Sequence, residues 1–285
     1  MSFAAILDGI SAKVAEACPE AQGDYLNDDG LLMCHKCDTP KQCRIHVQIA
    51  GIIDEERVVF KMCDCEQAAR AKEEQQRAHR DFLLRRDRNR HHGFADKEMQ
   101  QWTFANDDMS KPQLTQAMHN YVDHFAEFKA KGKGLLLYGD VGTGKTYAAC
   151  EVANALIDQG HQVLVTNFAK LCNTLQGMFE GRQQYIDSLN RYALLIIDDL
   201  AAERDTEYMQ EQVYNIIDAR YRAGLPMIIT TNLSGQQLKN PDSISKERIY
   251  SRILERCHPI EVKGADRRRA ALKDSYAQTK NILGM

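Results

Sequence analysis

A glycine-rich string that holds one lysine and one threonine is the part of this sequence with the clearest chemistry. It reads Gly-Asp-Val-Gly-Thr-Gly-Lys-Thr from Gly139 to Thr146. The apolar run 135–138 comes directly before it, and the helix-favouring run 148–151 follows shortly after it. In a strand–loop–helix context of this kind, the backbone N–H groups of the loop point at a phosphate. The string therefore predicts a binding site for a nucleoside triphosphate.

Each residue type in this loop has a physical role. The glycines permit backbone angles and a close approach that a Cβ would prevent. Lys145 has the length and charge to reach the β- and γ-phosphates, and the Thr146 hydroxyl is a ligand for Mg²⁺. A glycine-rich turn beside an unrelated lysine is the alternative, and the flanking pattern argues against it. The predicted phosphate-binding residues are Gly139, Asp140, Val141, Gly142, Thr143, Gly144, Lys145 and Thr146.

Two adjacent carboxylates end a second apolar run. Residues 194–197 are Leu-Leu-Ile-Ile, and Asp198 and Asp199 follow. A strand of this form, downstream of a phosphate loop, completes the site: Asp198 would hold Mg²⁺ through water, and Asp199 would orient and polarise the attacking water. The alternative is a strand that simply ends in a polar turn. An acid at the second position favours hydrolysis over transfer to another substrate.

A third apolar run, 226–229, ends in hydroxyls and an amide. Thr230, Thr231 and Asn232 follow it in that order. Asn232 or Thr231 is placed to hydrogen-bond the γ-phosphate or the water beside it. The alternative is a cap for the next helix, since Asn is a strong N-cap residue.

Clustered cysteines indicate a metal site near the N-terminus. Six of the nine cysteines lie before residue 66, and four of them form the close pairs Cys34–Cys37 and Cys63–Cys65 on either side of a predicted hairpin. Four thiolates are the ligand set of a tetrahedral structural Zn²⁺. A segment with so little apolar content would gain much of its stability from the metal.

The ligand set has open alternatives. Cys43, His35 and His46 are also nearby in the sequence, and Cys43 is the first substitute. Reduced free cysteines are the interpretation without metal.

Length and charge exclude some classes of protein. The chain has 285 residues and a formal net charge of −3, so no global basic field points to nucleic acid, and local charge must carry any such argument. The sequence has no signal-peptide pattern and no apolar run of membrane-spanning length. These features predict a cytoplasmic protein with no membrane partner.

The chain is predicted to have three parts. Residues 1–66 form a small zinc-binding domain, 67–91 a charged helical linker, and 92–285 the nucleotide-binding domain. The first part is predicted to open with an amphipathic helix over 1–17 and to hold a hairpin. Gly51 and the acidic pair at 54–55 are predicted to mark the turn of that hairpin.

The nucleotide-binding part alternates strands with helices. After a helix over about 112–131, strands are expected near 134–138, 162–166, 193–198 and 226–231. This alternation is typical of an α/β fold with a parallel sheet that helices cover on both faces.

The order of these motifs resembles the AAA+ ATPases, and specifically the bacterial and phage helicase loaders of the DnaC and DnaI type. The resemblance covers about residues 92–280 and rests on four segments. These are Gly139–Thr146, Leu194–Asp199, Ile228–Asn232 and Lys246–Ile253. The cysteine pattern is also similar to the N-terminal zinc module of some phage-type loaders.

The resemblance implies roles for two arginines. Arg252 is similar to the arginine finger that enters the ATP site of a neighbouring subunit, and Arg248 lies one helical turn away. An exposed basic helix face is the alternative. Gly264–Arg268 is similar to the sensor segment of the family, which places Arg268 near the γ-phosphate of its own subunit. Asp266 and Arg267 replace the usual Ser and Tyr, so the register is open among Arg267, Arg268 and Arg269.

The resemblance also implies a function. The expectation is a Mg²⁺- and ATP-dependent loader that self-associates through its AAA+ domain, binds a DnaB-type replicative helicase through its N-terminal domain, and hands it to single-stranded DNA during replication initiation. Phe179, Thr206 and Tyr208 lie in segments that tend to face the central channel of AAA+ assemblies and are candidate DNA contacts, with ordinary packing as the alternative.

Two other functions remain open. One is a transposition helper ATPase of the IstB type, which shares the AAA+ core and binds duplex DNA with a transposase. The other is an adaptor or helicase inhibitor that binds nucleotide with little hydrolysis. The N-terminal zinc module favours the loader.

Overall fold

The computed structural model describes residues 21–49, 53–94, 96–201 and 206–267, together with 276, 279–280 and 282–283. The chain divides into two compact units, Met1–Asp81 and Phe82–Met285. The helix predicted over 1–17 lies outside the described residues. The division falls inside one long helix, α2 (Asp64–Gly93), which overlaps the predicted linker 67–91.

The first unit contains two antiparallel hairpins. The short one pairs β1 (Tyr25–Leu26) with β2 (Leu32–Met33), and Asn27 Oδ1 holds its turn by accepting the Leu31 N–H at 2.8 Å. The long one pairs β3 (Gln42–Ile49) with β4 (Ile53–Phe60). The expectation that residues 54–55 belong to the turn was wrong, because Asp54 and Glu55 pair with Gln48 and Val47 inside the ladder.

Helix α2 forms because its sequence offers no helix breaker before its end. It carries acids in the first turn and basic residues in the last, which suits the helix dipole. Its C-terminal part joins the second unit, where Arg90 pairs with Asp158 at 2.6 Å. Gly93 ends the helix where a Cβ would come within 2.7 Å of the Val163 carbonyl. Among the described residues, no helix combines the length and apolarity that crossing a membrane requires.

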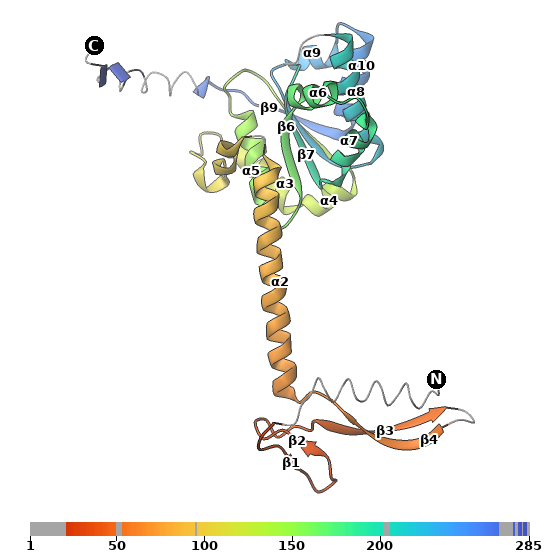
Figure 1. The fold of residues 1–285 in the computed structure, drawn as a ribbon. Helices are drawn as coiled ribbons and strands as arrows, with labels where there is room; N and C mark the ends of the chain where they lie inside the picture. Colours follow the sequence, from red (N-terminus) through yellow and green to blue (C-terminus); the bar gives the residue numbers. More distant parts are fainter. Residues whose placement is uncertain are drawn as a thin grey trace. The chain divides into compact units, whose positions relative to one another are not determined.

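The second unit is built on a five-stranded parallel sheet (Figure 1). Its strands, in the order β6-β7-β8-β5-β9, pair in parallel throughout. They are β5 (Gly134–Tyr138), β6 (Val163–Asn167), β7 (Leu194–Leu200), β8 (Met227–Thr231) and β9 (Cys257–Glu261). This α/β architecture confirms the predicted fold class.

Helices cover both faces of this sheet. The α-helices are α3 (Pro112–Asp123), α4 (Phe125–Ala130), α5 (Lys145–Asp158), α6 (Phe168–Gln176), α7 (Arg182–Ser188), α8 (Glu207–Arg222), α9 (Gly235–Lys239) and α10 (Ile244–Arg256). Three short 3₁₀ turns lie at η1 (Lys97–Gln101), η2 (Phe104–Asn106) and η3 (Leu189–Arg191).

Alternation along the strands divides the core into two layers. Leu135 and Leu137 pack with α3 and α5, whereas Leu136, between them, packs with α6, α8 and α10. Residues 194–197 alternate in the same way. Successive strand side chains point to opposite faces, so uninterrupted apolar runs are what a sheet covered on both sides requires.

In the second unit, two elements differ from the sequence-based expectation. The single helix predicted over 112–131 is two helices, because His124 leaves helical geometry at φ −103° and ψ 18°. Strand β9 was not predicted, since Cys-His-Pro-Ile-Glu carries little strand signal and Pro cannot donate to a ladder. The proline is tolerated because β9 is the last strand at the edge of the sheet.

One buried arginine fixes the amino-terminal ends of β7 and β8. The Arg220 side chain on α8 is 1% exposed. It donates to the carbonyl oxygens of Leu189, Tyr192, Ala193 and Pro226 at 2.8–3.3 Å. Burial lowers the pKa of Arg220 to about 10. These bonds give hydrogen-bond partners to backbone carbonyls just before the two strands.

Candidate nucleotide site and cysteine centre

The phosphate loop runs between β5 and α5. Gly142 and Gly144 have φ of +76° and +91°, a region that glycine enters without strain. Gly142 also lies against the Asp266 carboxylate, where a Cβ would come within 1.9 Å. The Lys145 ammonium, on the first turn of α5, donates to the carbonyl oxygens of Gly139 and Asp140 at 2.9 and 2.7 Å. The lysine is therefore held at the mouth of the loop.

Asp198 joins the phosphate loop to the acid-bearing strand. Its Oδ1 accepts the Thr146 hydroxyl at 2.8 Å and the Thr230 hydroxyl at 2.5 Å. Burial raises the pKa of the Asp198 carboxyl above its ordinary value, and the hydroxyls oppose that shift. A hydroxyl and a carboxylate at this separation are oxygen ligands of the kind that Mg²⁺ takes.

A bulge in β7 places Asp199. The β7–β8 register moves from Ile197↔Ile229 to Leu200↔Thr231, so β7 holds one extra residue there. Asp199 takes φ +55°, and its N–H donates to Thr230 Oγ1 at 3.0 Å. Bulges re-aim side chains at functional sites, and Asp tolerates this left-handed region better than most residues. Asp199 is exposed and lines the same cavity as the phosphate loop.

The end of β8 separates Asn232 from Thr231. Asn232 Oδ1 accepts the Lys145 ammonium at 2.8 Å and lines the cavity. The Thr231 hydroxyl is turned away and donates to the Leu200 carbonyl at 2.8 Å. Asn232 is not a helix cap either, because Ser234 caps α9 with a capping box. Of the two predicted candidates, only Asn232 reaches the lysine.

Aromatic side chains form one wall of the cavity. The cavity measures about 250 Å³, and Trp102 and Tyr147 line it with their rings stacked at 5.8 Å between centroids. The buried Asn154 amide holds this wall by donating to the carbonyls of Met99 and Trp102 at 3.0 Å. No site role was predicted for Trp102, Tyr147 or Thr230. Only Thr230, directly after an apolar run, carried a local signal.

A buried carboxyl lies behind this wall. Glu151 on α5 is 2% exposed, and its Oε1 has no hydrogen-bond partner within the described part of the chain. Burial, with the nearby Asp107, raises the pKa of Glu151 to about 8. A carboxyl with this pKa is mostly protonated at neutral pH, which limits the cost of burying it.

The sensor segment places Arg267 at the site. The Arg267 N–H donates to the Gly142 carbonyl at 3.0 Å, and its side chain lines the cavity. Arg268, the position favoured from the resemblance, and Arg269 lie outside the described residues. Of the three register candidates, the described structure therefore locates Arg267 alone.

Arg252 is held within its own subunit. It pairs with Asp218 on α8 at 2.8 Å, donates to the Tyr214 hydroxyl at 2.9 Å, and lies 4.7 Å from the centroid of that ring. A third nitrogen donates to the Arg248 carbonyl. Arg248 itself is exposed on α10. Arg252 therefore joins α8 to α10.

The candidate DNA contacts have different surroundings. Phe179, in the loop between α6 and α7, is fully exposed. The Thr206 hydroxyl caps α8 by accepting the Met209 N–H at 3.3 Å. Tyr208 is half-buried and packs against the α8 side of the core.

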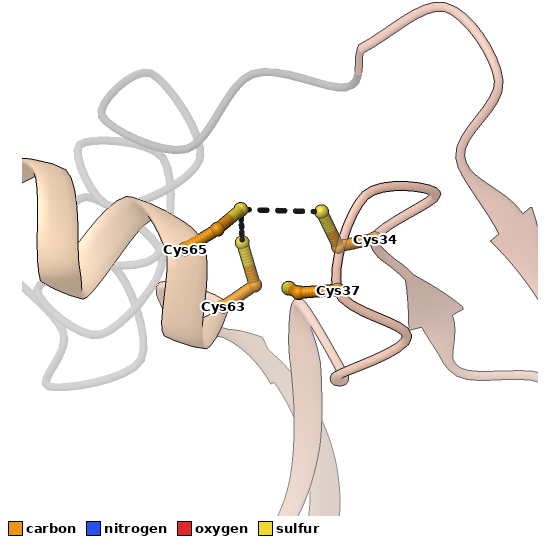
Figure 2. Close-up of side chains that lie close together, drawn as sticks. All are labelled: Cys34, Cys37, Cys63 and Cys65. Atoms are coloured by element: carbon orange, nitrogen blue, oxygen red, sulfur yellow. Dashed lines mark hydrogen bonds between the residues drawn. The ribbon is translucent and has the colours of Figure 1, made fainter.

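Four cysteines converge in the first unit (Figure 2). The thiols of Cys34, Cys37, Cys63 and Cys65 all lie within 4.8 Å of one another, the first pair from the loop before β3 and the second from the start of α2. Cys63 and Cys65 lie 3.3 Å apart, and Cys34 and Cys65 lie 3.6 Å apart. The sulfurs of a tetrahedral zinc site lie about 3.8 Å apart for Zn–S bonds of about 2.3 Å. The cluster fits such an ion with little movement.

Polar neighbours support the thiols. A hydrogen bond from Thr39 lowers the pKa of Cys37 to about 6. Lys41, 1% exposed, pairs with Asp24 and Glu66 at 3.0 Å each. Glu66 also accepts the Cys63 N–H at 3.3 Å. Cys43, the predicted substitute ligand, lies in β3 outside this group.

Comparison with known proteins gives the family. The profile of the family described as IstB-like ATP binding protein matches residues 60–275. The replicative helicase loader DnaI of Bacillus subtilis is 25% identical over 180 residues, which are 58% of each chain. A putative ATP-binding protein in an insertion sequence of Mycobacterium tuberculosis is 27% identical over 137 residues, 47% of this chain and 55% of that protein. The chain thus spans little more than half the length of these relatives.

A solved structure also resembles this chain. The crystal structure of DnaI is 25% identical and matches with a TM-score of 0.51 over 61% of this chain and 95% of that one. The expected resemblance to loaders of this type is therefore confirmed. Because the family profile covers most of the sequence, this protein belongs to the family of IstB-like ATP-binding proteins, and its second unit has the AAA+ fold of the helicase loader DnaI.

Proposed function

We propose that this protein is a Mg²⁺-dependent ATPase that loads a DnaB-type replicative helicase onto single-stranded DNA. The hydrogen bond between Thr146 and Asp198 carries the ATPase proposal, because it brings the two expected oxygen ligands together at the mouth of a phosphate loop. Likeness to the loader DnaI supports the helicase part.

The residues divide the work of hydrolysis. Lys145 exchanges its loop carbonyls for the phosphates, and Thr146 and Asp198 hold Mg²⁺, which neutralises phosphate charge when bound. Asp199 orients and polarises the attacking water, and Asn232 senses the γ-phosphate beside Lys145.

The proposed site depends on assembly, because one of its arginines comes from a neighbouring subunit. In the proposal, Arg252 acts across a subunit boundary after it exchanges Asp218 for a neighbour's phosphate. The sensor arginine, one of Arg267, Arg268 and Arg269, acts within the subunit. Self-association through the AAA+ domain follows from this division.

Asp199→Asn separates binding from turnover. We expect nearly unchanged ATP affinity and ATP hydrolysis lower by about 100-fold or more, which is the range for loss of a general base. Calorimetric titration and phosphate release measure the two effects. Lys145→Ala is the control and should lose both. Normal turnover in the Asp199 variant would refute its role.

The cysteine centre is proposed to hold Zn²⁺. Four converging thiols, spaced close to a tetrahedral set, support this. Two isolated hairpins bury little apolar surface, so the ion would stabilise the first unit. The proposed task of this unit is to bind the helicase.

Zinc content gives the test of this centre. We expect about one Zn²⁺ per chain by elemental analysis, because four thiolates saturate the ion. The double variant Cys34→Ser, Cys37→Ser should lose it, whereas Cys43→Ser should keep it. If wild-type protein is expressed with added zinc and contains none when freshly purified, the proposal is contradicted.

One alternative has specific support, and a second stays open. Similarity to the insertion-sequence protein supports a transposition helper of the IstB type. An adaptor or inhibitor would bind ATP with little turnover.

For the loader, three residues are proposed to contact single-stranded DNA: Phe179, Thr206 and Tyr208. Of these, Phe179 offers the most exposed ring on which a base could stack. Cytoplasmic location belongs to the same proposal.

Affinity capture tests the partner. Immobilised full-length protein, with ATP and Mg²⁺, should retain a purified DnaB-type helicase, and the retained complex should place the helicase on single-stranded DNA in a gel-shift assay. A purified transposase of an insertion sequence is offered to the immobilised protein as the competing partner. Retention of the transposase but not the helicase would overturn the loader in favour of the helper.

A further inference from the structure

The loop between η2 and α3 lies against the nucleotide cavity and has no role in the function proposed so far. It comprises residues 107–111, which here are called the acidic loop. Two of its side chains contact residues that line this cavity. Asp108 forms a close ion pair with Arg267, and the Lys111 ammonium donates to the Thr143 carbonyl of the phosphate loop at 2.7 Å.

The acidic loop is anchored independently of the cavity. Asp107 Oδ2 accepts the hydroxyl of the buried Thr115 at 2.6 Å, and its Oδ1 accepts the Met109 N–H at 3.2 Å. The Ser110 N–H donates to Asp108 Oδ1 at 3.0 Å, which leaves Oδ2 for Arg267. Asp108 is thus presented to the arginine by a loop fixed on α3.

Arg267 contacts both Asp108 and the phosphate loop. Its backbone bonds to Gly142, and its guanidinium lies 3.3 Å from the place that a Cβ on Gly144 would take. The Tyr147 ring lies 5.9 Å from the guanidinium carbon. A cation within this loop is close to the site where phosphates bind.

The ion pair is open to solvent. The side chains of Asp108 and Arg267 are 55% and 37% exposed, and a pair this accessible to water is weak. Arginine binds phosphate with charge-assisted, bidentate hydrogen bonds, which are stronger than a water-exposed carboxylate pair. Phosphates on the loop would therefore compete with Asp108 for the same guanidinium.

We propose that Asp108 is the counter-ion that holds Arg267 beside the phosphate loop and that Arg267 releases when a nucleoside triphosphate binds. Asp108 is then a positioning residue that weakens nucleotide affinity and links occupancy of the site to the acidic loop. This inference rests on the proposed ATP-binding function. It assigns the within-subunit arginine to Arg267.

A double-mutant cycle tests the exchange. Calorimetric titration of ATP with Mg²⁺ is done on full-length protein carrying Asp108→Asn, Arg267→Ala, or both. We expect Asp108→Asn to tighten ATP binding by about three- to fivefold, which is the range open to a weak ion pair. Arg267→Ala should weaken binding, and Asp108→Asn should then add almost nothing.

Matched control variants distinguish the exchange from a general effect of charge. Asp123→Asn removes the same charge from the exposed C-terminal end of α3 rather than from the acidic loop, and should change affinity by less than about twofold. Asp108→Ser serves as a second variant if the asparagine disturbs folding. Equal tightening in Asp123→Asn, an undiminished Asp108→Asn effect without Arg267, or weaker binding in Asp108→Asn would each overturn the exchange. If Lys145→Ala leaves ATP affinity unchanged, the proposed nucleotide site fails instead.

Discussion

The bonds of Asp198 to two hydroxyls are the interaction on which the rest of the nucleotide site depends. They connect the first turn of α5 with the ends of β7 and β8, through Thr146 and Thr230. All three elements meet at one edge because the strands are parallel and each delivers its carboxyl end there. The carboxyl is costly to bury, so it is tolerated only with donors or a cation beside it.

The same constraint explains the surrounding distortions. The bulge in β7 and the left-handed Asp199 keep Asp198 in the ladder while they aim the next carboxylate into the cavity. Arg220 fixes the other ends of the same two strands with five bonds to carbonyls. The two central strands that carry the candidate nucleotide site are therefore held at both ends.

Sequence reasoning succeeded where one local pattern determines the structure. Apolar runs predicted four of the five strands of the parallel sheet. The loop Gly139–Thr146 lies between a strand and a helix, as its glycines require. Sequence reasoning missed β9, whose proline is acceptable only because the strand ends the sheet. It also missed Trp102 and Tyr147, since Asn154, far away in sequence, holds Trp102 in the cavity, and Tyr147 stacks on that ring. Register in the sensor segment likewise depends on packing against Gly142, which periodicity cannot predict.

The arginines show how the site is balanced. Both Arg252 and Arg267 are paired with acids, Asp218 and Asp108, rather than left as isolated cations. In this account, each arginine exchanges a carboxylate for phosphate, so binding and assembly shift existing ion pairs. The cysteine centre belongs to the other compact unit and would stabilise it by a separate route.

The Mg²⁺ dependence of ATP affinity tests the role of Asp198 most directly. Calorimetric titrations of wild-type protein and Asp198→Asn are compared with excess Mg²⁺ and with EDTA. We expect Mg²⁺ to raise the ATP affinity of the wild type by about tenfold or more and to have almost no effect on the variant, because the metal would lose the carboxylate that holds it. An equal gain from Mg²⁺ in both proteins would contradict this role of Asp198.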